Sequence, residues 1–260
     1  MRRVLLFGAL VLVLGTGCDD DSCSPGGFCY VAEAVFFEEV PVTGQTDLFL
    51  WGSNGNVRIG VHRDADRVMV SGTRSVRSDS EADAALRLED LTVEVRAYFD
   101  RIMIDTMQPE DTEGRSYSVE YDVTLPADMI AHASIVNGNC RSTGATAGTL
   151  LSTINGNIDA VDLRGPATLV TVNGDVRADA VLADADEVML LSVNGHLDLT
   201  VPLATSALVE ARVHDGAISV RDLVLADLVR TNISLSGQLG DGAGVITLQT
   251  TNGNITLRGR

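Results

Sequence analysis

The dipeptide Asn-Gly recurs along this chain in one short context, as in "TINGNIDA", "TVNGDVRA", "SVNGHLDL" and "TTNGNITL". Aligned on their glycines, the central copies are 18, 18, 21 and 21 residues apart, and Asp replaces Asn in one copy. A nearly fixed period of this length is typical of stacked repeat units. The predicted turn motif comprises Asn54, Gly55, Asn137, Gly138, Asn155, Gly156, Asn173, Gly174, Asn194, Gly195, Asp215, Gly216, Asn252 and Gly253.

The residues that follow each glycine alternate between apolar and polar. Period-two alternation indicates a β-strand with one buried face. Asn and Gly both tolerate the positive φ angles of tight turns, so each unit is expected to be strand, turn, strand. Two residues after the glycines come Val57, Cys140, Ile158, Val176, Leu197, Ile218 and Ile255.

This register favours an all-β fold, a β-solenoid or β-helix-like stack of ~18–21-residue coils, because stacked coils place equivalent positions above one another. A sandwich of β-hairpins is the alternative, since Asn-Gly also forms hairpin turns. The long step from Gly216 to Gly253 predicts a degenerate coil with its turn at Asn232. The Gly253 copy is expected to end the stack, where an open strand edge could pair with another chain.

The early part of the chain has a different character. All aromatic residues precede Asp122, and stretches such as "YSVEYDVTLP" are typical of longer antiparallel strands with one solvated face. The segment "EADAALRLEDL" fits either a loop or a short helix. We therefore divide the chain into a signal peptide (1–17), a polar tether (18–30), an N-terminal β region that caps the stack (31–130) and a repeat region (131–260).

The amino terminus has the features of a secretory signal. Arg2 and Arg3 precede the apolar run 4–14, which is too short to span a bilayer, because that takes about 20 residues. The "GTGC" sequence that follows resembles the lipobox of bacterial lipoproteins, and this resemblance implies lipid attachment at Cys18. An ordinary secreted protein, with Cys18 removed or paired, is the alternative. The expected location is the bacterial cell envelope, facing an extracytoplasmic space, on either the inner or the outer membrane.

The charge of the chain excludes several functions. Removal of residues 1–17 would leave 17 Arg against 36 Asp and Glu, a net charge near −19, and the sequence contains no lysine. An acidic surface repels nucleic-acid phosphates, so no nucleic-acid partner is expected. Without lysine, neither Schiff-base chemistry nor a phosphate-loop lysine is available.

The sequence predicts different environments for the other three cysteines. Cys23 and Cys29 bracket a Pro-Gly-Gly turn that could join them in a disulfide, with two unpaired tether cysteines as the alternative. Cys140 occupies an apolar column of the repeat, so it is predicted to be a buried free thiol.

No catalytic or metal site is predicted. The "HDG" at His214–Gly216 fills a turn position, and the sequence holds no G-x-S-x-G, H-E-x-x-H or EF-hand pattern. No cofactor is expected. A polysaccharide-acting enzyme on a β-helix is the least favoured alternative, because the repeat region lacks the aromatic residues that commonly line sugar subsites.

The repeats, together with "NGNVRI" and "YDVTLP", resemble the bacterial putative-adhesin family of repeat β-solenoid domains. That resemblance implies an envelope location and no catalytic residue. The sequence therefore predicts a non-enzymatic, lipid-anchored envelope protein that binds an envelope protein or polysaccharide through an extended β surface, and that could self-associate through its terminal edge. A sensory or regulatory envelope module that binds one protein partner is the alternative.

Overall fold

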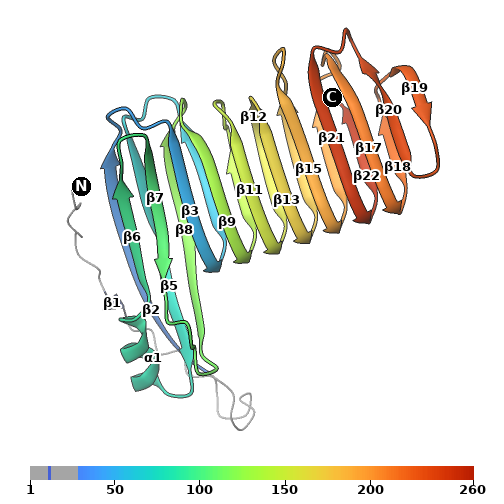
Figure 1. Ribbon diagram of the computed structural model, residues 1–260. Helices are drawn as coiled ribbons and strands as arrows, with labels where there is room; N and C mark the ends of the chain where they lie inside the picture. Colours follow the sequence, from blue (N-terminus) through green and yellow to red (C-terminus); the bar gives the residue numbers. More distant parts are fainter. Residues whose placement is uncertain (1–10, 13–28) are drawn as a thin grey trace.

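The computed structural model describes residues 11–12 and 29–260, which form two large mixed β-sheets and one short helix (Figure 1). Each sheet has eleven strands. In spatial order, sheet A contains β1 (Val11–Leu12), β2 (Tyr30–Pro41), β5 (Arg67–Ser78), β8 (Ser116–Pro126), β4 (Val57–His62), β10 (Cys140–Thr143), β12 (Ile158–Arg164), β14 (Val176–Val181), β16 (Leu197–Val201), β22 (Ile255–Gly259) and β18 (Ile218–Arg221).

Sheet B faces sheet A across the core. In spatial order it contains β19 (Ala226–Arg230), β20 (Ser234–Leu239), β17 (Ala207–Asp215), β21 (Gly244–Asn252), β15 (Glu187–Asn194), β13 (Ala167–Asn173), β11 (Thr149–Asn155), β9 (Ile130–Asn137), β3 (Asp47–Asn54), β7 (Arg101–Met107) and β6 (Thr92–Ala97). Each Asn-Gly turn connects a strand of sheet B to the next strand of sheet A.

The repeats pair in parallel and in the register that their glycine alignment predicts. Ile158 of β12 pairs with Val176 of β14, which pairs with Leu197 of β16. All three side chains are about 1% exposed. The apolar columns of the two sheets therefore meet in one core, and this hydrophobic burial holds the repeat region together.

The fold is all-β as predicted, but the prediction of a β-solenoid or β-helix-like stack of coils is wrong. Both sheets are mixed, because antiparallel pairs flank the parallel centre: β2 with β5 and β5 with β8 in sheet A, and β6 with β7 and β17 with β20 in sheet B. The chain also does not advance one unit at a time. The unit β3–β4 lies beside β9–β10, although residues 63–129 separate the two units in the chain.

The last repeat unit shows the same departure from chain order. Strands β21 and β22 lie between β15–β16 and β17–β18, so the Gly253 copy is an interior unit with neighbours on both sides (Figure 1). The expectation that this copy ends the stack is therefore wrong. At that end of the molecule the outermost strands are β18 in sheet A and β19 in sheet B.

The segment around Asn232 does not form the predicted degenerate coil. Strands β19 and β20 form an antiparallel hairpin, and β20 pairs antiparallel with β17. Leu228 of β19 is half exposed, so it does not join the core. With its turn glycine missing, this segment folds back on its neighbour instead of turning into sheet A.

The helix α1 (Glu81–Leu88) packs at the other end of the molecule, against β2 and β5. Its N-cap is Ser80, whose hydroxyl accepts a hydrogen bond from the Asp83 backbone N–H. Such a cap satisfies one of the free N–H groups of the first turn. Ala84 and Leu88 are its buried residues. Among the two structures that the sequence left open for this segment, the helix is therefore the observed one.

Candidate binding surface

The Asn-Gly turns form one edge of the molecule, and their first column is an amide ladder. The asparagines lie in register on adjacent strands, and each side-chain N–H₂ donates to the side-chain oxygen of the preceding unit. The five Nδ2–Oδ1 distances are 2.7–2.8 Å, for the pairs Asn137–Asn54, Asn155–Asn137, Asn173–Asn155, Asn194–Asn173 and Asn252–Asn194.

A second ladder runs two residues further along the chain. Here the backbone N–H of one unit donates to the side chain of the preceding unit, as from Asn157 to Asn139 Oδ1 at 2.8 Å. Asp175 takes the same place in its unit, and His196 accepts through Nδ1 from the Asn254 backbone at 2.9 Å. The proton of the His196 ring is therefore assigned to Nε2.

The glycines of the turns are required by close packing between units. A Cβ atom on Gly156 would lie 1.9 Å from the Gly138 carbonyl oxygen, and one on Gly174 would lie 1.9 Å from the Gly156 oxygen. Buried hydroxyls add to this packing, because Thr153 and Thr171 donate to those same carbonyls at 3.0 and 2.9 Å. The role of the motif visible in this geometry is structural.

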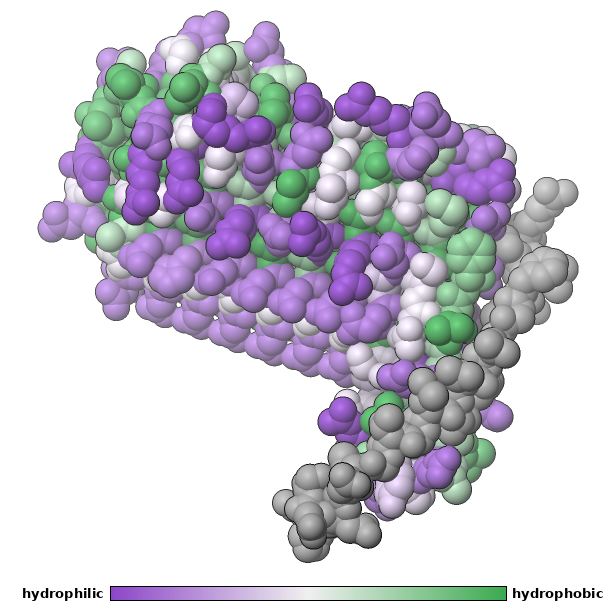
Figure 2. Space-filling view, turned by 180° about the vertical axis from the view of Figure 1, so that it is seen from behind, coloured by the Kyte–Doolittle hydropathy of each residue, from purple (hydrophilic) through white to green (hydrophobic). Residues whose placement is uncertain are grey.

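This turn edge offers few free polar groups to a partner. Figure 2 shows it as a hydrophilic band along the lower edge of the body, where β9, β11, β13 and β15 end in Figure 1. Most of its amide groups are already bonded to the neighbouring unit. A ligand would have to break these bonds to use them, so the turn edge is a poor candidate for a binding site.

In the repeat region, from β10 to β22, the outer face of sheet A is polar and its charges are paired between neighbouring strands. At the other end of the same sheet, β2 exposes Val35 and Phe37. Arg141 of β10 lies 3.4 Å from Asp159 of β12. Asp198 of β16 lies 4.0 Å from Arg258 of β22. Exposed pairs like these contribute little stability but keep the face hydrated.

The outer face of sheet B is much more apolar. The residue before each turn asparagine points outward on four adjacent strands, as Val136, Ile154, Val172 and Val193, and these side chains are 37–46% exposed. The adjacent strands lie about 4.8 Å apart, so the four side chains form one continuous row. A contiguous exposed apolar row, unlike a scattered apolar residue, marks an interaction surface.

An aromatic cluster lies on this face at β3 and β9. The Phe49 ring stacks on the His132 ring at 4.2 Å between centroids, and on the Trp51 ring at 5.5 Å. His132 Nε2 lies 2.9 Å from Asp47 Oδ1, which fixes the imidazole. Partial burial alone would raise the pKa of Asp47, but hydrogen bonds from Thr46 and His132 bring it below its usual value. Trp51 is 42% exposed and gives the face a rigid aromatic contact.

A concavity of about 550 Å³ lies at the opposite end of the same face. Strands β17 and β21 form its floor, and the turn between β19 and β20 forms a wall. Its polar lining includes Glu210, Arg212, His214, Gln249, Thr231 and Ser234. The outer face of sheet B thus runs from an aromatic cluster, across an apolar row, to a polar hollow.

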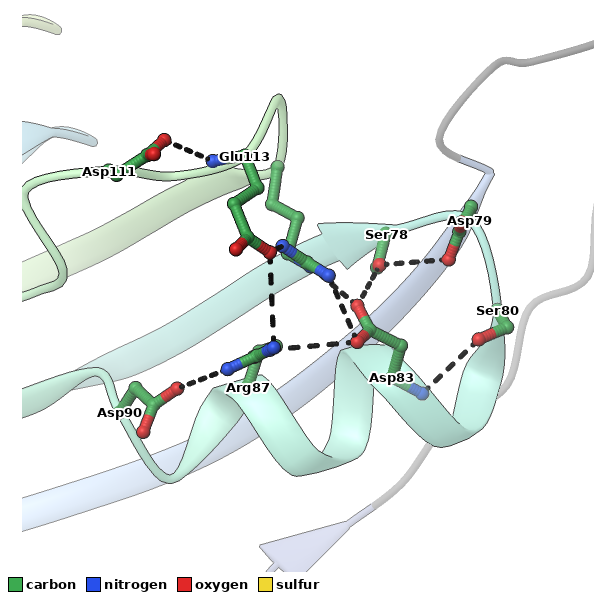
Figure 3. Close-up of polar contacts among 9 residues, drawn as sticks. Ser78, Asp79, Ser80, Asp83, Arg87, Asp90, Asp111 and Glu113 are labelled. Carbon is green, nitrogen blue, oxygen red and sulfur yellow. Dashed lines mark hydrogen bonds and ion pairs between the residues drawn. The ribbon is translucent and has the colours of Figure 1, made fainter.

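A cluster of charged side chains around Asp83 serves a structural purpose (Figure 3). Asp83 of α1 accepts two hydrogen bonds from Arg115, at 2.6 and 3.1 Å, and a third from Ser78. Arg87 lies 3.6 Å from Asp83 and 3.5 Å from Asp90. The hydrogen bonds from Arg115 and Ser78 lower the pKa of Asp83 to about 2. This cluster ties the helix to the segment before β8.

The predicted cysteine sites are only partly covered by the structure. Cys18 and Cys23 lie outside the described residues, so lipid attachment and the Cys23–Cys29 disulfide stay predictions. Cys140 is 1% exposed, and burial raises the pKa of its thiol to about 12. A thiol in that environment is a poor nucleophile, since the thiolate is the reactive form.

Within residues 11–12 and 29–260, no group of three or more His, Cys, Asp and Glu side chains is placed to hold a metal ion. No helix in the same residues has the length and apolar character needed to cross a bilayer.

Sequence reasoning missed the outer face of sheet B. It identified the buried columns and the turn residues, whereas Val172 and its equivalents point outward beside the asparagines. The aliphatic residue directly before each Asn-Gly pair was the available signal. It is one position out of phase with the buried columns of its strand, and so it belongs to the exposed face.

Comparison with known proteins gives weak structural similarities only. No family model matches the sequence, and no curated protein matches it. The fold is similar to a putative cell adhesion protein from Clostridium sporogenes, with 12% identity, coverage of 87% of this chain and all of that chain, and a TM-score of 0.47. It is also similar to a putative adhesin from Bacteroides fragilis, with 9% identity, coverage of 87% and 97%, and a TM-score of 0.32. A third similar structure is a putative lipid binding protein from Parabacteroides distasonis, with 10% identity, coverage of 86% and 96%, and a TM-score of 0.22.

Proposed function

We propose that this chain is a non-enzymatic binding protein of the bacterial cell envelope, attached to a membrane by lipid on Cys18, and that the outer face of sheet B is its binding surface. Its role is structural or adhesive. The face spans β3 to β17, which are six strand spacings apart, or about 29 Å. A surface of that length suits an extended partner that makes many weak contacts.

The observation that carries this proposal is the contrast between the two outer faces. From β10 to β22 sheet A presents hydrated ion pairs, whereas sheet B presents Trp51 and the apolar row of Val136, Ile154, Val172 and Val193. Both faces belong to the same body and have the same strand spacing, so the strand arrangement alone does not require the difference. Aromatic anchors are enriched where proteins bind partners, and contiguous exposed apolar patches mark such surfaces.

The binding proposal is tested with matched variants of the full-length protein. Ile154→Thr and Val172→Thr together would remove apolar surface from sheet B while keeping β-branched side chains that suit a strand. Val161→Thr, on the outer face of sheet A, is the control. Wild type and control should capture the same envelope component from a solubilised envelope fraction, and the double variant should capture at least 10-fold less. Equal capture by all three proteins would refute the proposal.

The anchor is tested separately. Incorporation of labelled palmitate into the expressed protein should occur with Cys18 and disappear in Cys18→Ser, whereas Cys140→Ser should still be labelled. Labelling that persists in Cys18→Ser would contradict lipid attachment at Cys18. Loss of the anchor would not affect the binding test, which uses a different part of the chain.

A further inference from the structure

We infer that the concavity on β17, β20 and β21 is a subsite for a neutral, polyhydroxylated ligand, that is, an uncharged saccharide unit. This inference rests on the proposed binding role of sheet B and names the ligand class for one end of its outer face. The concavity holds about 550 Å³, within the range of about 300–1,000 Å³ that is usual for small-molecule sites.

The concavity lies where the outward columns of sheet B change character. Val170 of β13 pairs with Leu191 of β15, which pairs with Gln249 of β21 and then with Arg212 of β17. Aliphatic side chains at the centre of this column are thus replaced by hydrogen-bonding side chains at its end. The change coincides with the hollow, so the polar groups gather where a ligand can be enclosed.

The wall of the concavity is pre-organised. The turn between β19 and β20 is closed by Thr231, whose hydroxyl lies 2.7 Å from that of Ser234 and accepts from the Ser234 backbone N–H at 3.0 Å. Val213 of the floor donates its backbone N–H to the Ile233 carbonyl at 2.9 Å. A wall fixed in this way loses little conformational freedom on binding.

The floor offers unused hydrogen-bonding groups. Within the described part of the chain, the side chains of Gln249 and His214 make no hydrogen bond. Arg212 bonds only to Glu210, so its guanidinium keeps free N–H donors and the carboxylate keeps free lone pairs. Donors and acceptors therefore lie side by side, and a sugar hydroxyl, which both donates and accepts, can satisfy either kind. The described residues of the lining include no Phe, Trp or Tyr, so this subsite would hold a sugar by hydrogen bonds and not by stacking on an aromatic ring.

Charge and backbone pairing exclude the competing ligand classes. The lining contains one carboxylate and one guanidinium, in a chain of net charge −17, so an anionic ligand is repelled. An extended peptide usually binds by adding a strand to an open sheet edge. Here β17, β20 and β21 each have hydrogen-bonded neighbours on both sides, so no edge is open at the concavity.

The inference is tested by calorimetric titration of the full-length protein with five neutral hexasaccharides (cello-, malto-, manno-, xylo- and chitohexaose) and with hexagalacturonate as the anionic probe. At least one neutral probe should bind. Arg212→Ala and Gln249→Ala should each weaken its binding at least 10-fold, whereas Arg141→Ala on sheet A should not change it. All three residues are exposed, so the variants should fold, and a thermal melt of each checks this.

Three outcomes would overturn the inference: binding of no neutral probe, binding of hexagalacturonate alone, or neutral binding that both concavity variants leave unchanged. Each can be told apart from failure of the proposed function. If envelope capture still depends on Ile154 and Val172 while the saccharides do not bind, the binding face stands and the saccharide subsite falls. If saccharides bind through Arg212 but the apolar row has no effect on capture, the saccharide subsite is supported and the proposed apolar binding face is refuted.

Discussion

The antiparallel end of the molecule and its repeat region hold their strands together by different means. The antiparallel end (β2, β5, β8, β6, β7 and α1) uses aromatic packing, as between Phe36 and Tyr121, and the charged cluster around Asp83. The repeat region has no aromatic residue after Tyr121 and uses neutral amide ladders and close glycine contacts. Stability of the repeat region should therefore depend on shape, and that of the antiparallel end on charge as well.

The largest effect is expected from deleting residues 244–260, which form β21 and β22. These strands separate β15–β16 from β17–β18, and four of their side chains, Ile246, Leu248, Ile255 and Leu257, are at most 1% exposed. Full burial of each contributes about 1.5–3 kcal/mol, so their joint loss approaches the total stability of a typical domain.

The deletion should therefore unfold residues 207–239 as well, which hydrogen exchange would show as loss of amide protection in β17 and β20. In a stack that followed chain order, removing the last unit would only fray one end. Retained protection in β17 would show that this strand reattaches to β15 and that the observed strand order is not essential.

A smaller effect is expected from Gly156→Ala in the turn edge. Its Cβ would lie 1.9 Å from the Gly138 carbonyl oxygen, so the two units must move apart. Overpacking of this kind costs about 1–3 kcal/mol, and a backbone clash should reach the upper end of that range. Gly60→Ala in β4 is the control, because its Cβ would meet nothing within 4 Å. Urea unfolding that gives equal stabilities for the two variants would contradict the close packing.

For the repeat region, the sequence predicts the register of the strands but not their order. The period and turn residues predict the register, because Asn155 and Asn173 can ladder only when the strands align. The strand order cannot be predicted in this way, because the unit that contains Asn194 could equally lie beside the unit of Asp215 or that of Asn252. Every unit presents the same columns. The β19–β20 hairpin, which has no turn glycine, occupies one edge of β17, and β21 pairs with the other edge. The concavity escaped prediction for the same reason, because its lining residues meet only through that hairpin.

The antiparallel end should lose stability in acid, because Asp83 becomes protonated. Hydrogen bonds from Arg115 and Ser78 lower its folded pKa to about 2 from an ordinary 3.8. A carboxyl with a depressed folded pKa stabilises the fold above its unfolded pKa, and this contribution is lost as the pH falls from about 4 to 2. Asp83→Asn should therefore lower stability at pH 7 and flatten the acid dependence in that window.

The control is Asp159→Asn, which removes a carboxylate from an exposed pair in the repeat region and should change neither the stability at pH 7 nor its acid dependence. The measurement is denaturant unfolding of each protein across pH 2–7, and parallel curves for Asp83→Asn and wild type would contradict this role.

The smallest effect is expected from Asp215→Asn, and this substitution should stabilise the protein instead of destabilising it. Asn252 donates its side-chain N–H to Asn194 at 2.7 Å, so its side-chain oxygen is left for the next unit, which is Asp215. A carboxylate has no N–H to donate, and the amide ladder stops there. Asparagine at 215 would supply the missing donor and extend the ladder by one bond. Because the position is exposed, the gain should be about 0.5–1 kcal/mol, measured by urea unfolding. Asp215→Ala removes the carboxylate without supplying a donor. If it stabilised the protein equally, the gain would come from relieved charge, and the ladder would contribute nothing at this end.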